Sequence, residues 1–190
     1  MESVYIEGKT FNKIPYSKNQ LNIGEYENCT FINCDFSNSD FAGINFMDCV
    51  FDNCNLSMVN LANTAFREIT FRNCKMLGLH FENCNKFGLS FNFENTSLNH
   101  SSFYQTKIKK TNFKNTSLQE VDFSECDLTN SIFDNCDFLG ATFENTSIEN
   151  ADLETSFNYA IDPISNRIKK AKFSLSGISG LLVNFDVIIV

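Results

Sequence analysis

A period of five residues runs through most of this chain and limits the folds that it can adopt. A large apolar residue recurs at every fifth position, and a small or aliphatic residue stands two positions before it. In the clearest stretch the large residues are Phe31, Phe36, Phe41, Phe46, Phe51 and Leu56. Neither the period of about 3.6 residues of a helix nor the two-residue period of a strand gives this pattern. The sequence therefore predicts a repeat architecture.

The repeat forms two blocks that differ in phase. The large residue falls at every fifth position from Phe31 to Phe81, and again from Phe93 to Leu153. Between the blocks, Lys86 stands where a large apolar residue is due. We interpret residues 82–93 as an insertion, bulge or jog, for which Gly88 can supply unusual backbone angles. The jog is either a tolerated irregularity or a kink that shapes a binding surface.

The chain divides into an N-terminal cap and lead-in, a repeat body and a C-terminal segment, at residues 1–22, 23–156 and 157–190. A cap is expected because the end of a solenoid exposes unpaired backbone groups. Asp162 and Pro163 interrupt the pattern and predict a turn or an excursion from the last coil. Beyond them we expect a short apolar helix at 175–185 and a strand at 187–190.

The five-residue period predicts a square coil with a solid interior. Two inward side chains in each pentad leave three residues, mostly polar, for the solvent. Four pentads then complete one turn, and successive turns pair as strands about 4.8 Å apart. Counting the pentads of both blocks gives about six coils and a core of roughly 30 Å along the axis. The fold class is therefore all-β, a parallel β-helix followed by a short helix and strand.

The composition fits such an interior. Phe occurs 21 times while Trp is absent, as expected when one side-chain shape is required at equivalent sites. All eight cysteines occupy the small position of the repeat, at 29, 34, 49, 54, 74, 84, 126 and 136. No C-x-x-C pair is present, so core packing is a better interpretation than a metal site or a disulfide.

The charge of the chain restricts its partners and its location. The formal net charge is −8, which argues against direct binding of nucleic acid. No apolar run follows a basic N-terminus, and no stretch approaches the roughly 18 apolar residues of a membrane span. We therefore expect a cytoplasmic protein that does not bind membranes.

The pentads resemble those of the pentapeptide-repeat family. The family pattern has a small residue, Asp or Asn, then Leu or Phe, and two mostly polar residues. Here it stands as 34–38 (CDFSN), 54–57 (CNLS) and 126–130 (CDLTN), and similar pentads cover most of the chain. The resemblance implies a right-handed quadrilateral parallel β-helix.

The second repeat block carries a run of acids without a basic residue. Between 118 and 156 these acids are Glu120, Asp122, Glu125, Asp127, Asp134, Asp137, Glu144, Glu149, Asp152 and Glu154. One interpretation is a solvated surface that keeps a Phe-rich rod soluble. The other is a polyanionic surface that binds a basic, DNA-reading protein, because DNA carries one negative charge per roughly 1.7 Å of its axis.

The plan of two blocks, a break and an apolar tail is similar to that of the Qnr and MfpA group within the family. That resemblance implies a homodimer joined at the C-terminus, which mimics DNA, binds DNA gyrase or topoisomerase IV and protects it from quinolones. The residues expected to form the dimer contact are Leu181, Leu182, Phe185, Val187, Ile188 and Ile189. These residues could instead cap the last coil. The alternative function is a scaffold for another basic protein.

Catalysis is not expected from this sequence. The two histidines, His80 and His100, are far apart in the pattern, and no nucleophile elbow, phosphate loop or metal-spaced cluster is present. Carboxylates on a convex rod lack the pocket that would shift their pKa values. We therefore expect neither an active site nor a cofactor.

Overall fold

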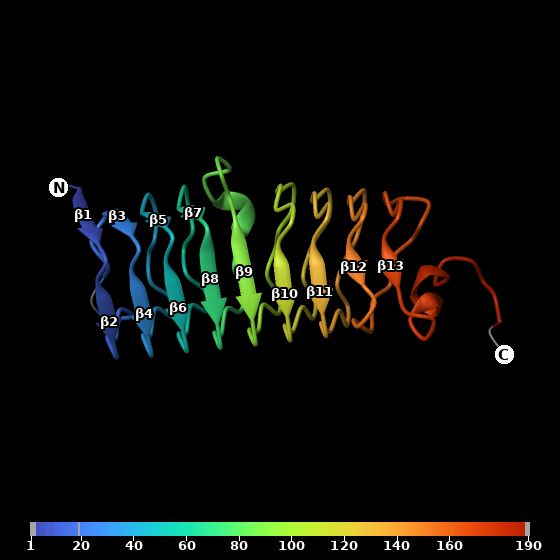
Figure 1. Cartoon of the computed structure of the whole chain (residues 1–190), viewed down its shortest axis with the longest axis horizontal. Coiled ribbons are helices and arrows are strands. Elements are labelled where there is room, and N and C mark those ends of the chain that lie inside the picture. Colours follow the sequence, from blue (N-terminus) through green and yellow to red (C-terminus); the bar gives the residue numbers. More distant parts are fainter. Residues whose placement is uncertain (1–2, 19, 189–190) are drawn as a thin grey trace.

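The computed structural model describes residues 3–18 and 20–188, which coil into an elongated solenoid (Figure 1). Each turn has four sides and contains 20 residues, so that Phe11 pairs with Phe31 and Phe31 with Phe51. All strand pairs are parallel. The predicted all-β parallel β-helix is confirmed.

Two of the four faces carry continuous sheets. The longer sheet has nine strands: β2 (Thr10–Asn12), β4 (Thr30–Ile32), β6 (Val50–Asp52), β8 (Ile69–Arg72), β9 (Phe91–Glu94), β10 (Asn112–Lys114), β11 (Ile132–Asp134), β12 (Asp152–Leu153) and β13 (Lys172–Phe173). The shorter sheet has four: β1 (Val4–Glu7), β3 (Gly24–Glu27), β5 (Asn45–Met47) and β7 (Ala65–Arg67). The other two faces are joined by isolated bridges.

We number the faces in chain order from Phe11 onward and define each by its inward central residues. Face 1, the nine-stranded sheet, is centred on Phe11, Phe31, Phe51, Phe71, Phe93, Phe113, Phe133, Leu153 and Phe173. Face 2 is centred on Tyr16, Phe36, Leu56, Met76, Leu98, Leu118 and Phe138. Face 3 is centred on Leu21, Phe41, Leu61, Phe81, Phe103, Phe123 and Phe143. Face 4, with the four-stranded sheet, is centred on Ile6, Tyr26, Phe46, Phe66, Ile108, Leu128, Ile148 and Ile168.

Stacked aromatic rings fill the interior. On face 1 the ring centroids of Phe93 and Phe113 are 5.1 Å apart, and those of Phe113 and Phe133 are 4.7 Å apart. The rings of both pairs are nearly parallel, and all three side chains are buried. The ring spacing follows the strand spacing, so the same residue type fits in turn after turn.

Asparagine forms the corners between faces. The second residue after most central positions adopts a positive φ, and 12 of these corner residues are Asn, the residue other than glycine that tolerates this conformation best. At the corner that follows face 1, the side chains also form hydrogen bonds from one coil to the next. The Nδ2 of Asn115 donates to Asn95 Oδ1 at 3.0 Å, and that of Asn135 donates to Asn115 at 2.9 Å.

The jog is an insertion of two residues. Successive strands of face 1 are 20 residues apart, but Phe71 pairs with Phe93, which is 22 residues on. Lys86 therefore leaves the interior in a loop at 86–89, where Gly88 has φ +68°. Phe91, at a position that elsewhere holds a small residue, turns inward and replaces the missing ring. Its centroid lies 5.7 Å from that of Phe66 and 5.3 Å from that of Phe81.

The cysteines are all free and buried, as the core-packing interpretation predicts. Burial raises the pKa of the Cys49 and Cys136 thiols to about 12, which keeps them protonated at neutral pH. The Cys136 thiol donates to the carbonyl of Phe113 at 3.4 Å. Among the described residues, no group of three or more His, Cys, Asp or Glu residues could hold a metal ion.

The solenoid is longer than the sequence predicted. β1 and β2 already pair with the next turn, and β13 pairs with β12, so segments 4–12 and 172–173 belong to the rod. The nine strands of face 1 are separated by eight steps, which span about 38 Å at about 4.8 Å each. The estimate of six coils was too low because the outermost pentads depart from the pattern.

The helix expected at 175–185 is confirmed only in part, because it is a short 3-10 turn limited to Ile178–Leu181. Gly177 and Gly180 pack directly against Tyr159, and both lower helix propensity. The expected strand is wrong where it can be judged: Val187 and Ile188 are in no strand, and residues 189–190 lie outside the described residues. No helix in the described part of the chain is long and apolar enough to cross a membrane.

Candidate partner-binding surface

The ten acids between 118 and 156 all point away from the core, and none is buried. They surround the rod rather than line one face. Face 1 carries Asp134, Asp152 and Glu154; face 2 carries Asp137; face 3 carries Asp122 and Glu144; face 4 carries Asp127 and Glu149; Glu120 and Glu125 stand at the two corners of face 3. The structure thus brings four of the ten together on face 3 and its corners, namely Glu120, Asp122, Glu125 and Glu144.

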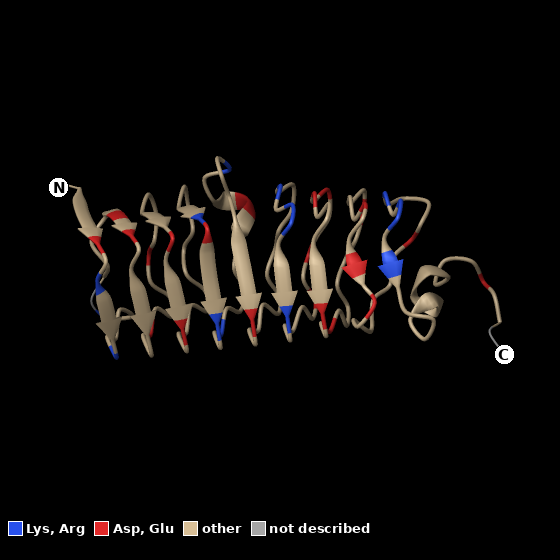
Figure 2. Ribbon diagram, viewed as in Figure 1, with Lys and Arg blue, Asp and Glu red and all other residues tan. Residues whose placement is uncertain are grey.

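Face 1 is balanced in charge. Acids and bases alternate along it in a single column, Asp52, Arg72, Glu94, Lys114 and Asp134 (Figure 2). Arg72 Nε lies 3.2 Å from Glu94 Oε2, and Lys172 Nζ lies 2.8 Å from Asp152 Oδ2. The hydrogen bond and charge of Lys172 hold the pKa of Asp152 below its usual value. Opposite charges therefore lie side by side along this face.

Face 3 carries acids and two histidines: His80 Nδ1 lies 2.9 Å from Glu82 Oε1, and at one corner His100 Nδ1 lies 3.1 Å from Glu120 Oε2. Asp40 and Glu82 precede Asp122, Glu125 and Glu144 along it, and the described residues of this face between 40 and 145 include no Lys or Arg. Sequence reasoning missed Asp40 and Glu82, which lie on the same face only because the jog adds two residues. A spacing of 20 residues between coils, raised to 22 across the jog, would have placed them on this face.

Hydrogen bonds from neighbouring residues hold two of these carboxylates in place. Asp122 Oδ1 accepts the backbone N–H of Ser124 at 2.8 Å. Glu125 accepts the side-chain amide of Gln105 at 2.8 Å and the Tyr104 hydroxyl at 3.2 Å. The acids therefore form an ordered array in solvent, which costs a partner little to recognise.

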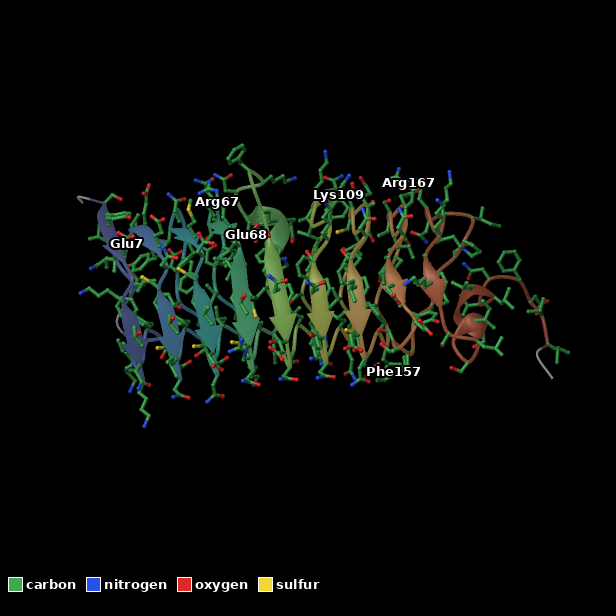
Figure 3. All side chains as sticks on the ribbon, viewed as in Figure 1. Glu7, Arg67, Glu68, Lys109, Phe157 and Arg167 are labelled. Carbon is green, nitrogen blue, oxygen red and sulfur yellow. The ribbon has the colours of Figure 1, made fainter. Side chains whose placement is uncertain are left out.

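Besides Lys86 in the jog, face 4 and its corners hold seven of the 15 Lys and Arg residues. They are Arg67, Lys107, Lys109, Lys110, Arg167, Lys169 and Lys170, and three of them are labelled along one edge of the rod in Figure 3. Lys109 Nζ lies 3.0 Å from Asp127 Oδ2. Burial works against the charge of Asp127, but hydrogen bonds from Thr129 and Lys109 outweigh it and lower its pKa. The rod is thus acidic on face 3 and basic on parts of face 4.

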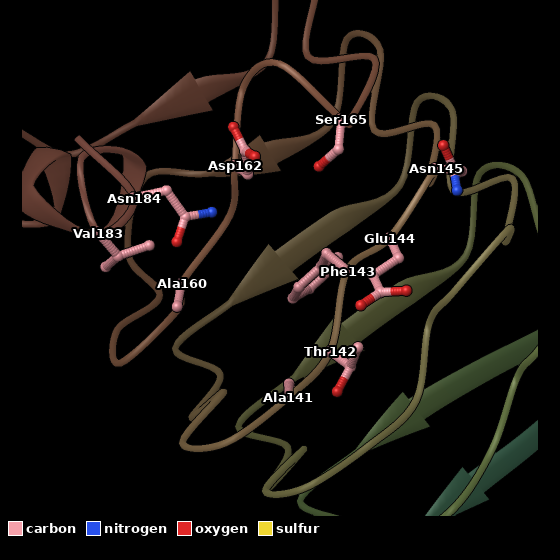
Figure 4. A pocket seen from close by; sticks show the side chains of 10 residues that line it. All are labelled: Ala141, Thr142, Phe143, Glu144, Asn145, Ala160, Asp162, Ser165, Val183 and Asn184. Carbon is pink, nitrogen blue, oxygen red and sulfur yellow. The ribbon is translucent and has the colours of Figure 1, made fainter.

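A hollow of about 390 Å³ lies between face 3 and the C-terminal segment (Figure 4). Its polar lining includes Glu144, Asp162, Ser165 and Asn184, and it includes no histidine, cysteine or lysine. The backbone N–H of Ile164 donates to Asp162 and lowers the pKa of its carboxyl group. Asp162 is therefore ionised at neutral pH and is not available as a general acid.

The residues expected in a dimer contact fall into two groups. Leu181 is buried in the core of its own chain and caps the last coil, and Leu182 is partly buried. Phe185, Val187 and Ile188 are exposed, the last by 91%. Ile189 lies outside the described residues. Sequence reasoning missed Leu175, Ile178 and Val183, which are also exposed at this end of the rod.

A parallel β-helix with four faces, a ring-filled interior and charged outer surfaces defines a solenoid of the kind built from pentads. The pentapeptide repeat region matches residues 25–92 and 78–153, so the chain belongs to the pentapeptide-repeat family, whose fold is a right-handed quadrilateral β-helix.

Solved structures support the same fold. A trypsin-treated form of QnrB1, a plasmid-mediated fluoroquinolone resistance protein, is 19% identical, with a TM-score of 0.64 and full coverage of both chains. Full-length QnrB1 is 20% identical, with a TM-score of 0.64 over 95% of this chain and 99% of that one. No curated protein matches the sequence.

Proposed function

We propose that this protein is a non-enzymatic, acidic rod that binds a type II topoisomerase, DNA gyrase or topoisomerase IV, in place of DNA, and protects it from quinolones. Face 3 is the contact surface in this proposal. The likeness of its fold to QnrB1, a fluoroquinolone resistance protein, supports the choice of partner. The protein acts from the cytoplasm.

The observation that carries the proposal is the array of carboxylates on face 3. Asp122 and Glu125 lie on one coil and Glu144 lies on the next, and the described residues of that face include no Lys or Arg between 40 and 145. A DNA-binding saddle is lined with Lys and Arg, and its affinity for a polyanion comes largely from these charges. A rigid surface of the same sign can compete for it.

A gyrase supercoiling assay tests the proposal. We expect the purified protein to inhibit supercoiling in a dose-dependent and salt-sensitive manner, or to restore supercoiling in the presence of a quinolone. The salt sensitivity follows because the contacts are ionic. Absence of both effects at concentrations well above that of the enzyme would favour the alternative, a scaffold for another basic protein.

We also propose that two chains pair through the C-terminal end, where Phe185, Val187 and Ile188 expose apolar surface. An isologous contact of two such ends would remove these side chains from water. Analytical ultracentrifugation should show a dimer of twice 21.6 kDa for the full chain and a monomer for Phe185→Ser combined with Ile188→Ser. A matched control is Met58→Ser, because Met58 is 60% exposed but lies in the N-terminal half of the rod, far from the C-terminal end. A monomeric wild-type chain would contradict the pairing.

A further inference from the structure

The jog creates a hollow on face 4. Lys86 occupies the place of a central residue but turns outward, so the loop at 86–89 stands away from the following coil, as the projecting green loop in Figure 1 shows. Between the loop and that coil lies a cavity of about 300 Å³ lined by Lys86, Leu89, Gln105 and Lys107. A cavity needs only about 10–15 Å³ of such volume per water molecule, so this one has room for a small solvated ion.

The lining of this cavity is positively charged. Neither Lys86 nor Lys107 forms an ion pair with any residue that the structure describes, and no carboxylate lines the cavity. The carboxylates nearby are engaged elsewhere: Glu125 accepts hydrogen bonds from Gln105 and Tyr104, and Asp127 pairs with Lys109. The cavity therefore carries a positive charge, although the net charge of the protein is −8.

The loop is held in this shape from the preceding coil. The guanidinium carbon of Arg67 lies 5.6 Å from the centre of the Phe87 ring, a cation–π contact. Gly88, at φ +68°, packs against the Arg67 side chain, whose Nε is buried without an acceptor. The cavity is therefore formed before any ligand arrives, which lowers the cost of binding.

We propose that this cavity binds a phosphate monoester group. Lysine ammonium groups bind phosphate as point charges, and the two of them match the double negative charge of a monoester at neutral pH. A diester of a nucleic-acid backbone carries only one charge and would leave one ammonium uncompensated. This inference does not depend on topoisomerase binding, because the cavity lies on face 4 and the proposed enzyme contact lies on face 3.

Titration of the full-length, ¹⁵N-labelled protein with inorganic phosphate at pH 7.5 tests the proposal by NMR. We expect saturable shifts of the amide signals of residues 86–89 and 105–107. Removal of one ammonium by Lys86→Gln or Lys107→Gln should raise the Kd at least tenfold, since each removes a charge-assisted contact. Lys169→Gln is the matched control, because Lys169 is exposed on the same face in the last coil. Its Kd should equal that of the wild type.

Two thymidine dinucleotides, with and without a 5′-phosphate, distinguish the sources of the phosphate group. We expect only the 5′-phosphorylated dinucleotide to shift the signals of the cavity. Equal shifts with both would show recognition of the diester backbone and overturn the monoester assignment. Shifts that spread to all lysine-bearing coils, or that survive in Lys86→Gln and Lys107→Gln, would overturn the site itself.

Discussion

Replacement of Phe91 by alanine should lower the free energy of unfolding by about 3–5 kcal/mol, although alanine is what the repeat pattern favours at that position. Phe91 occupies the small position of its pentad, and elsewhere on face 1 that position holds Cys, Ile, Thr, Ser or Ala. Here the ring fills the space that Lys86 leaves when it turns outward. It contacts the rings of Phe66, Phe81 and Phe93, and its side chain is 2% exposed. Alanine would leave a cavity among three rings that cannot move toward one another. Urea unfolding followed by circular dichroism measures the loss.

Thr111→Ala is the matched control for Phe91→Ala, because Thr111 holds the same position one coil further on. Its hydroxyl donates to the carbonyl of Ile108 at 2.8 Å, and the loss of one such hydrogen bond costs about 1 kcal/mol. Similar losses for the two variants would mean that the loop at 86–89 closes over the space, and that Phe91 is not the compensating residue.

The interior of this protein could be predicted from the sequence because equivalent inward positions require the same kind of side chain in every turn. A period of five with four pentads in each turn places Phe113 over Phe93, and the structure confirms that stacking. The small position was equally clear, and all eight cysteines are buried there. The number of turns was underestimated because the pentads of Ile6 and Ile168 depart from the pattern and were not recognised as repeats: Tyr5 and Arg167 stand where Asp or Asn is usual.

The arrangement of charges on the surface required the structure. A spacing of 20 assigns residues to faces on both sides of the jog only if the length of the jog is known. With an uninterrupted period Asp40 would align with Glu120, whereas the two inserted residues align it with Asp122 instead. The sequence therefore presented the ten acids as one block, and only the folded chain separates a balanced face 1 from an acidic face 3. The length of the C-terminal helix was mispredicted for a local reason: Gly177 and Gly180 pack against Tyr159, where a larger side chain would not fit.

If face 3 is the surface that gyrase recognises, neutralising three of its acids should abolish the effect on supercoiling. The variant combines Asp122→Asn, Glu125→Gln and Glu144→Gln. The amides keep the size of the side chains and can still accept the hydrogen bonds from Ser124 and Gln105, so the fold should be retained. Three ionic contacts of about 1 kcal/mol each correspond to a loss of affinity of about 100-fold. The protein concentration that gives half of the maximal effect in the supercoiling assay measures it.

The control for this variant changes the net charge by the same amount on other faces. Asp134→Asn, Glu149→Gln and Glu154→Gln alter one Asp and two Glu on faces 1 and 4, and none of the three forms an ion pair with a residue that the structure describes. We expect less than a threefold change, because these side chains would not face the enzyme. Equal losses in both triple variants would show that gyrase senses the total charge of the rod, as an unstructured polyanion would be sensed. A loss in the control alone would move the contact from face 3 to face 1 or face 4.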